Sequence, residues 1–195
     1  MRPHTKQGIR GTYLEARRQL DAATVAALSE AIRQRLEEVV EYRRAGAVLS
    51  YVASKDNEVD TRPVIAAALG AGRTVLVPIA EPGGGMIWSR IHSLDGLVPS
   101  RFGILEPMRS RRRIVRPPAD GVVLVPGVAF SENGYRIGYG GGYFDRFLRP
   151  YEGIAIGLAY ESQIAAGLPV EPHDVPVDLV VTESRVVRPD AGCGD

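Results

Sequence analysis

The sequence is poor in the residues that build disulfides and thiolate metal sites. Its 195 residues include one cysteine, Cys193, and three histidines, His4, His92 and His173. One thiol cannot form an internal disulfide or a cysteine-rich metal site, so we expect a reducing compartment. His173 and Asp174 are neighbours, but the other two histidines are distant in sequence, and no three-ligand zinc site is predicted.

Long apolar runs and a strong net charge are also missing. No uninterrupted apolar stretch approaches the roughly 20 residues that span a bilayer, and the first ten residues, MRPHTKQGIR, have no apolar signal core. The formal net charge is +1, which gives no general attraction to nucleic acid or membranes. We therefore expect a cytoplasmic monomer that has neither nucleic-acid nor membrane partners.

The apolar residues that are present predict one α/β domain. After the N-cap candidate Asp21, five apolar residues recur at spacings of three and four, which indicates a helix: Val25, Leu28, Ile32, Leu36 and Val39. A second helix is predicted over 61–69, with Thr61 as cap, Pro63 in the first turn and Gly70 as stop. Short apolar runs predict strands at 45–53, 73–80, 86–91, 121–130, 153–160 and 177–183. A short helix is expected at 143–148, and the alternation of elements predicts a mainly parallel sheet.

Polar segments follow several of these strands. They are SKDNEVDT (54–61), the stretch from Pro126 to Gly142, and ESQ (161–163). In parallel sheets ligands bind beyond the carboxyl ends of the strands, so we expect the functional site there. We predict one domain over 1–188 and a disordered tail over 189–195.

The most unusual segment is RIGYGGGYFDRFL, residues 136–148. Its glycines allow backbone N–H groups to approach an anion closely, and a helix N-terminus favours a phosphate. Arg136 could bind phosphate oxygens through its guanidinium, and Asp145 offers the hard oxygen that magnesium prefers. The alternative is a glycine-rich surface turn. The segment matches neither a P-loop nor a Rossmann fingerprint, so generic motifs do not decide between the two.

A longer stretch is more specific. VPGVAFSENGYRIGYGGGYFDRFL (125–148) closely resembles the signature of the 5-formyltetrahydrofolate cyclo-ligase family. Four other segments resemble that family in the same order: KQGIR (6–10), NEVDT (57–61), GILEP (103–107) and LPVEPHDVPVDLVVTE (168–183). The resemblance runs from about residue 6 to residue 185. It implies a three-layer α/β/α sandwich and the ATP- and magnesium-dependent closure of 5-formyltetrahydrofolate to 5,10-methenyltetrahydrofolate, with release of ADP and phosphate.

The resemblance also implies which residues bind ATP. It places Lys6 and Arg10 at the phosphates, where a spacing of four puts both on one face of a helix. Without the resemblance, a solvated charge pair is the better interpretation. The rest of the ATP site is implied to be the loop Arg136, Ile137, Gly138, Tyr139, Gly140, Gly141, Gly142, Tyr143 and Phe144. Arg136 and Lys6 are expected to stabilise the transferred phosphoryl group, and no protein nucleophile is required.

The folate and metal residues follow from the same resemblance. Glu58 is expected to hydrogen-bond the pterin ring. Either Tyr51 or its neighbour Val52 is expected to line the pterin or formyl pocket, although Tyr51 could be a simple core aromatic. The loop tyrosines, Tyr139 and Tyr143, could contact folate as well as nucleotide. Asp145 is expected to bind magnesium, and Asp178 is either a second metal ligand or a turn or cap residue.

Several alternatives stay open. The arginine-rich segment MRSRRRIVR (108–116) could attract the γ-carboxylates of a polyglutamylated folate, or it is a solvated loop. Phe144 and Gly141 depart from relatives that carry tyrosine and lysine there. The chain could instead be another ATP-dependent folate or thiamine-related ligase, or a non-catalytic folate, nucleotide or RNA-binding relative. The set of Lys6, Arg10, Glu58, Arg136 and Asp145 favours catalysis.

Overall fold

The computed structural model describes residues 5–100 and 103–189. The expectations about His4, Cys193 and the tail after residue 189 lie outside the described residues. The helices are α1 (Lys6–Arg18), α2 (Ala22–Glu38), α3 (Val40–Arg44), α4 (Arg62–Gly70) and α5 (Tyr143–Leu148), with 3₁₀ turns at Arg109–Arg111 and Glu161–Gln163. The strands are β1 (Ala47–Ser50), β2 (Thr74–Ala80), β3 (Met86–Ile91), β4 (Leu97–Pro99), β5 (Leu105–Pro107), β6 (Ile114–Val115), β7 (Val122–Val125), β8 (Ala129–Ser131), β9 (Arg136–Ile137), β10 (Ile154–Leu158), β11 (Ile164–Ala165), β12 (Leu179–Val181) and β13 (Val186–Val187).

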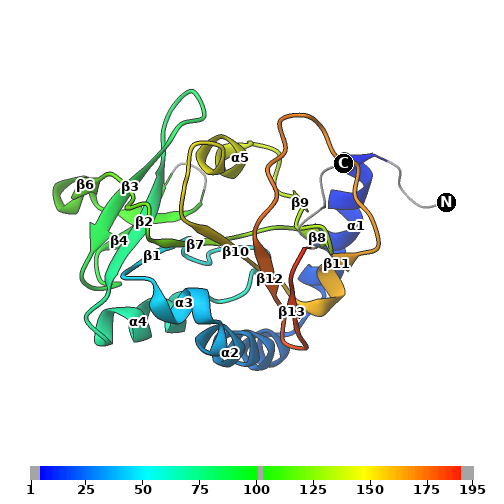
Figure 1. The fold of residues 1–195 in the computed structure, drawn as a ribbon, viewed down its shortest axis with the longest axis horizontal. Coiled ribbons are helices and arrows are strands. Elements are labelled where there is room, and N and C mark those ends of the chain that lie inside the picture. Colours follow the sequence, from blue (N-terminus) through cyan, green and yellow to red (C-terminus); the bar gives the residue numbers. More distant parts are fainter. Residues whose placement is uncertain (1–4, 101–102, 190–195) are drawn as a thin grey trace.

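An eight-stranded sheet in the order β13-β12-β10-β7-β1-β2-β3-β6 forms the centre of the molecule (Figure 1). Its inner strands, from β12 through β10, β7 and β1 to β2, pair in parallel. The outer strands, β13 on one side and β3 and β6 on the other, pair antiparallel. The expected mainly parallel α/β sheet is confirmed.

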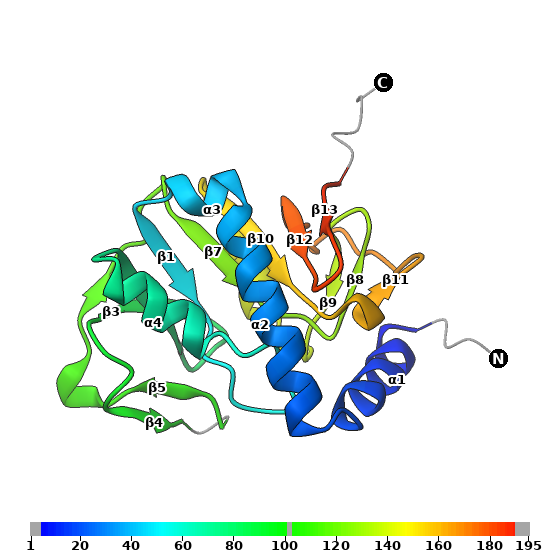
Figure 2. The same ribbon diagram turned by 90° about the horizontal axis from the view of Figure 1, so that it is seen from below.

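Helices cover both faces of this sheet. Helices α2, α3 and α4 lie on one face and α5 lies on the other (Figure 1), and Figure 2 shows α2, α3 and α4 in front of the sheet. The side chains of β1 alternate accordingly: Val48 packs into the core that contains Ile32 and Leu36 of α2, whereas Leu49 packs into the core that contains Leu148 of α5. Because both faces are buried, all four residues of β1 are apolar or fully enclosed. The three-layer arrangement matches the expectation.

The two longer predicted helices begin where the sequence indicates, although one cap differs. Asp21 caps α2, because its Oδ1 accepts a hydrogen bond from the Thr24 backbone N at 2.8 Å. Thr61 precedes α4 but makes no side-chain capping bond to it. Its hydroxyl donates instead to the Tyr51 carbonyl at 2.6 Å and accepts from the Ala53 backbone N at 3.2 Å. Thr61 therefore fixes the segment that leaves β1.

The strand expected over 121–130 is wrong as one element. It consists of β7 in the large sheet and β8 in a separate three-stranded sheet with β9 and β11. Pro126 between them has no N–H for a ladder. At Gly127 a side chain would place its Cβ 2.3 Å from the Phe130 ring. The break allows the chain to turn out of the large sheet at the carboxyl end of β7.

Membrane insertion through a helix finds no support. None of the helices in the described residues combines the length and apolar character that crossing a bilayer requires.

Candidate functional site

A cavity of about 560 Å³ lies at the carboxyl ends of three neighbouring parallel strands. Tyr51 and Val52 follow β1, Gly127 follows β7, and Ala80 ends β2, and all four line this cavity. This is the sheet edge at which the polar segments predicted a ligand site.

Helix α1 brings two cations to the cavity. Thr5 caps the helix by accepting a hydrogen bond from the Gly8 backbone N at 3.2 Å. Ile9 packs against Ala129 of β8 and Ile137 of β9. This contact turns Lys6 and Arg10, one helical turn apart, toward the cavity, and both line it.

The glycine loop, residues 138–142, forms another wall of the cavity. Arg10 Nε donates to the Gly138 carbonyl at 2.7 Å and so fixes the start of the loop. Gly140 and Gly142 have φ values of +100° and +63°, which L side chains rarely adopt. Gly142 is the N-cap of α5. The flanking residues Arg136, Ile137, Tyr143, Phe144 and Asp145 also line the cavity.

Arg136 is a nearly buried cation at the base of this loop, with 8% of its surface exposed. Its Nη1 donates to the Val175 carbonyl at 2.7 Å, and its Nη2 donates to Asp145 Oδ1 at 3.1 Å. The same carboxylate oxygen accepts from the Val175 backbone N at 3.2 Å. Burial lowers the pKa of Arg136, and the charges of Asp145 and Asp174 oppose that shift. The glycine loop and the segment before β12 are therefore joined through charged hydrogen bonds.

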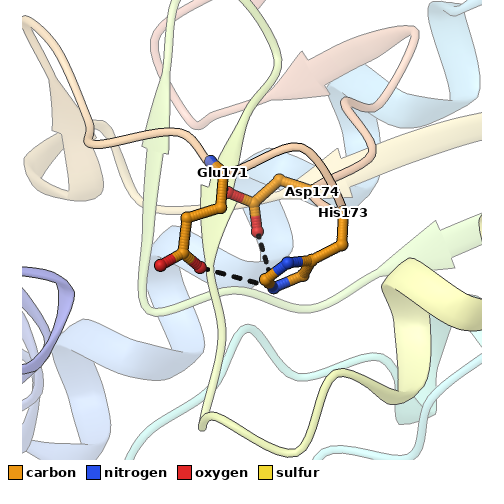
Figure 3. Close-up of side chains that lie close together, drawn as sticks. All are labelled: Glu171, His173 and Asp174. Carbon is orange, nitrogen blue, oxygen red and sulfur yellow. Dashed lines mark hydrogen bonds and ion pairs between the residues drawn. The ribbon is translucent and has the colours of Figure 1, made fainter.

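Two carboxylates that the sequence analysis left unassigned lie beside Lys6. Lys6 Nζ is 2.7 Å from Glu171 Oε2, and 2.8 and 2.6 Å from the two oxygens of Asp174. The side chains of Glu171, His173 and Asp174 gather within 4.8 Å of one another, and Figure 3 shows the imidazole turned toward both carboxylates. Despite desolvation, hydrogen bonds from Lys6 and the Glu171 backbone N hold the pKa of Asp174 below its ordinary value. In the sequence, these three residues stand together in the segment EPHD (171–174), which could have indicated the cluster.

The cavity is also lined by the residues expected to bind folate. Glu58 lines it, and its Oε2 lies 3.4 Å from the Ser54 backbone N. Burial raises the pKa of Glu58, and the positive charges of Arg17 and Lys55 oppose the shift. Tyr51 and Val52 both line the cavity, and the Tyr51 hydroxyl donates to the Val59 carbonyl at 2.9 Å. Both Tyr51 and Val52 therefore lie where the sequence analysis expected one of them.

Asp178 does not line the cavity with the other predicted site residues. Its Oδ2 accepts from the Ala155 backbone N at 2.7 Å, and its own backbone N donates to the Ala155 carbonyl at 2.9 Å. Both residues lie at the amino ends of strands β10 and β12, whereas the cavity lies at carboxyl ends. Asp178 lies at a bend immediately before β12, which agrees with the turn alternative that the sequence left open. We therefore withdraw the metal role from Asp178.

A further acidic residue that the sequence analysis missed is Glu106 of β5. It is 5% exposed and lines the cavity. Its carboxylate accepts from the Ala80 backbone N at 3.2 Å and from Arg112 Nη2 at 3.1 Å. Arg112 belongs to the arginine-rich segment 108–116, which is thus tied to the cavity wall through one ion pair. Glu106 is the glutamate of GILEP (103–107), a segment that the sequence analysis singled out only by its resemblance to the family.

Comparisons with known proteins show which family this chain resembles. The model of the 5-formyltetrahydrofolate cyclo-ligase family matches residues 2–183. The Escherichia coli K12 protein named 5-formyltetrahydrofolate cyclo-ligase is 37% identical over 138 residues, which cover 68% of this chain and 76% of that protein. The Haemophilus influenzae protein of the same name is 28% identical, over 93% of this chain and 100% of its own length.

Solved structures show the same likeness in three dimensions. The NMR structure of Aquifex aeolicus 5,10-methenyltetrahydrofolate synthetase has a TM-score of 0.83 and 34% identity, covering 97% of this chain and 95% of that one. A 5,10-methenyltetrahydrofolate synthetase from Mycoplasma pneumoniae shares the fold, with a TM-score of 0.72 at 21% identity over 91% of this chain and 98% of its own. The family model spans the glycine loop, Glu58 and the segment of Asp174. The chain therefore belongs to the 5-formyltetrahydrofolate cyclo-ligase family.

Proposed function

We propose that this chain, acting as a monomer in the cytoplasm, converts 5-formyltetrahydrofolate to 5,10-methenyltetrahydrofolate with ATP and magnesium, releasing ADP and phosphate. One observation carries the proposal: a single cavity is lined both by the cations and glycine loop suited to phosphates and by Glu58 and Tyr51, which suit a pterin. The two reactants can therefore meet in one cavity, as a transfer between them requires.

The reaction proceeds through activation of a poor electrophile. The formyl oxygen attacks the γ-phosphorus of ATP, and the bond to ADP breaks. N10 then attacks the formyl carbon and loses its proton, and the phosphorylated oxygen leaves as phosphate, which completes the five-membered ring. The loop N–H groups hold the phosphates, and Arg136 with Lys6 stabilises the charge that spreads over the transferred group. No covalent bond to the protein forms, which agrees with a cavity whose cations and carboxylates serve to bind and orient.

Asp145 and Asp174 are the residues whose chemistry fits magnesium. Both are carboxylates that line the cavity, both act on the buried Arg136, and the Val175 backbone N that binds Asp145 immediately follows Asp174. Hard oxygen ligands of this kind suit a magnesium ion that also contacts phosphates. When bound there, the ion would supply charge neutralisation for the phosphates. Lys6, which donates to Asp174 here, would then turn to a phosphate oxygen.

Cosubstrate dependence tests the reaction directly. Methenyl product should form from 5-formyltetrahydrofolate only when a nucleoside triphosphate and a divalent metal are both present, because the formyl oxygen must be phosphorylated first. The measurement is the absorbance of the methenyl product, together with ADP, of which one should form per product. Product that accumulates at full rate in excess EDTA contradicts the mechanism.

Glu58→Gln should weaken folate binding by about 1.5–3 kcal/mol, the scale of a hydrogen bond to a charged group. The amide keeps the shape of the carboxylate but loses the charge that accepts from the pterin N–H groups. Affinity for ATP should change little, because the phosphates are expected at the other wall of the cavity. Calorimetry with each ligand separately measures both effects, and unchanged folate affinity would remove Glu58 from the site.

The pH dependence of folate affinity provides an internal control for that variant. Burial raises the pKa of Glu58 above its ordinary 4.5, so its charged form is lost at a higher pH than for an exposed glutamate. Folate affinity of the wild type should therefore fall as the pH is lowered toward this raised pKa. The Glu58→Gln variant should lack this component of the pH dependence, and an identical pH profile for both proteins contradicts the assignment.

A further inference from the structure

Arg17 is a buried cation that the proposed chemistry does not use. Only 3% of its surface is exposed, and among the ion pairs of the described residues none involves it. Its guanidinium donates instead to three neutral oxygens: the Asp56 carbonyl at 2.6 Å, the Gly127 carbonyl at 3.0 Å and the Tyr139 hydroxyl at 2.6 Å. Burying a charge without a paired carboxylate is costly, so these contacts require an explanation beyond the stability of α1.

The three acceptors belong to three separate segments of the chain at the cavity, although Asp56 itself does not line it. Gly127 lies in the turn between β7 and β8, Tyr139 lies in the glycine loop, and both line the cavity. Asp56 lies two residues before Glu58. Arg17 itself does not line the cavity. It therefore lies behind the walls and holds them, and neither reactant is expected to touch it.

Helix α1 contacts the glycine loop through two arginines. Arg10 and Arg17 are seven residues apart, two turns along one face of α1. Arg10 holds the glycine loop at the Gly138 carbonyl, and Arg17 holds the next residue, Tyr139, at its hydroxyl. Lys6, which belongs to the same face, reaches the segment before β12. A shift of α1 would thus displace the whole phosphate-binding wall.

Hydrogen bonds also fix the loop that carries Glu58. Asp56 and Asn57 both have positive φ values, +51° and +53°, which cost energy in residues other than glycine. Contacts with α1 and the glycine loop maintain this conformation: the Tyr139 hydroxyl donates to Asp56 Oδ2 at 3.0 Å, and Asn57 Nδ2 donates to the Leu20 carbonyl at 2.8 Å and the Arg17 carbonyl at 3.2 Å. The loop that carries Glu58 is therefore fixed against the residue Tyr139 and the end of α1.

We propose that Arg17 is a positioning residue that sets the separation between the nucleotide wall and the pterin wall, and so aligns the formyl oxygen with the γ-phosphate. The inference rests on the proposed function. Each ligand can still bind its own wall when Arg17 is absent, but the reacting atoms lose their alignment. The expected signature is therefore a lower kcat with little change in either KM. The rates are measured well above the raised pKa of Glu58, because losing the charge of Arg17 raises that pKa further.

The test compares Arg17→Met with Arg18→Met in the full chain. Arg18 is the next residue and donates to Asp56 Oδ1 at 2.8 Å, but its side chain is 52% exposed, so it is a matched control. Arg17→Met should lower kcat on the order of 100-fold, the effect of misplacing reacting groups by about 1 Å, with the KM values for ATP and folate within about threefold. Arg17→Lys, which keeps the charge, should recover part of the loss. Arg18→Met should match the wild type.

Tyr139→Phe keeps the inference testable if Arg17→Met fails to fold, which circular dichroism will show. It removes one acceptor of Arg17 and leaves the two carbonyl contacts intact. Its kcat should fall by about tenfold, the loss of one hydrogen bond to a charged group. The double variant should lose less than the product of the two single effects, because the bond between Arg17 and Tyr139 can be lost only once, although the bond from Tyr139 to Asp56 Oδ2 is lost in addition. A rise in KM with unchanged kcat in these variants, or Arg17→Met equal to Arg18→Met, overturns the role of Arg17 alone. A wild type that forms no product overturns the proposed function first.

Discussion

Asp145→Asn should reduce turnover by at least about 100-fold while nucleotide affinity falls much less, because a metal ion contributes several kcal/mol to stabilising phosphoryl charge. Asparagine keeps a side-chain oxygen that can still accept from Arg136 and from the Val175 backbone N. It loses the negative charge that makes Asp145 a ligand for magnesium. The nucleotide retains Lys6, Arg10 and the glycine loop, so its binding survives better than the reaction does.

A magnesium titration separates these two effects. The concentration of magnesium that gives half-maximal rate should rise in Asp145→Asn, and nucleotide affinity should be measured beside it by calorimetry. Asp178→Asn is the matched control, because its oxygen can still accept from the Ala155 backbone N at the other end of the strands. If Asp178→Asn shifts the magnesium requirement as strongly as Asp145→Asn, then the metal site is not the one proposed.

These aspartates also show where sequence reasoning reaches its limit. Asp174 and Asp178 lie four residues apart in one segment that resembles the family, and composition does not distinguish them. The distinction is tertiary. Asp174 precedes Val175, whose backbone N and carbonyl bind Asp145 and Arg136, whereas Asp178 immediately precedes β12. Lys6, the partner of Asp174, is 168 positions away in sequence. No local pattern encodes such a contact.

Elements with a strong local signal were predicted well. Strand β3 and helix α5 have the predicted bounds, 86–91 and 143–148, because a short apolar run and a glycine cap mark them without help from distant residues. The short strands β8, β9 and β11 were not separated, since each has two or three residues and is stabilised by pairing across the chain. Arg17 was missed for a related reason: its three acceptors lie 39, 110 and 122 positions away.

Gly142→Val should abolish ATP binding while the fold persists. Gly142 has a φ of +63° as the N-cap of α5, and valine is strained there. Its Cβ would also lie 2.9 Å from Arg146 Nη1. Arg146 donates to the Gly141 carbonyl at 2.6 Å and to the Gly84 carbonyl at 2.9 Å, so displacing its guanidinium weakens contacts that hold the loop. Losing two loop hydrogen bonds to phosphate, about 3–6 kcal/mol, weakens ATP binding at least about 100-fold.

Gly72→Val is a control in which a side chain is placed at a positive φ away from the cavity. Gly72 follows α4 and has a φ of +72°, and a Cβ at this position would have no other atom within 4 Å. Gly72→Val should therefore lose stability, on the order of 1–3 kcal/mol, and should keep its ATP affinity. Calorimetry measures the affinity of both variants, and circular dichroism with thermal unfolding measures their folding. If Gly142→Val is folded and binds ATP as the wild type does, the glycine loop is a structural turn, and the phosphates must bind at a different wall of the cavity.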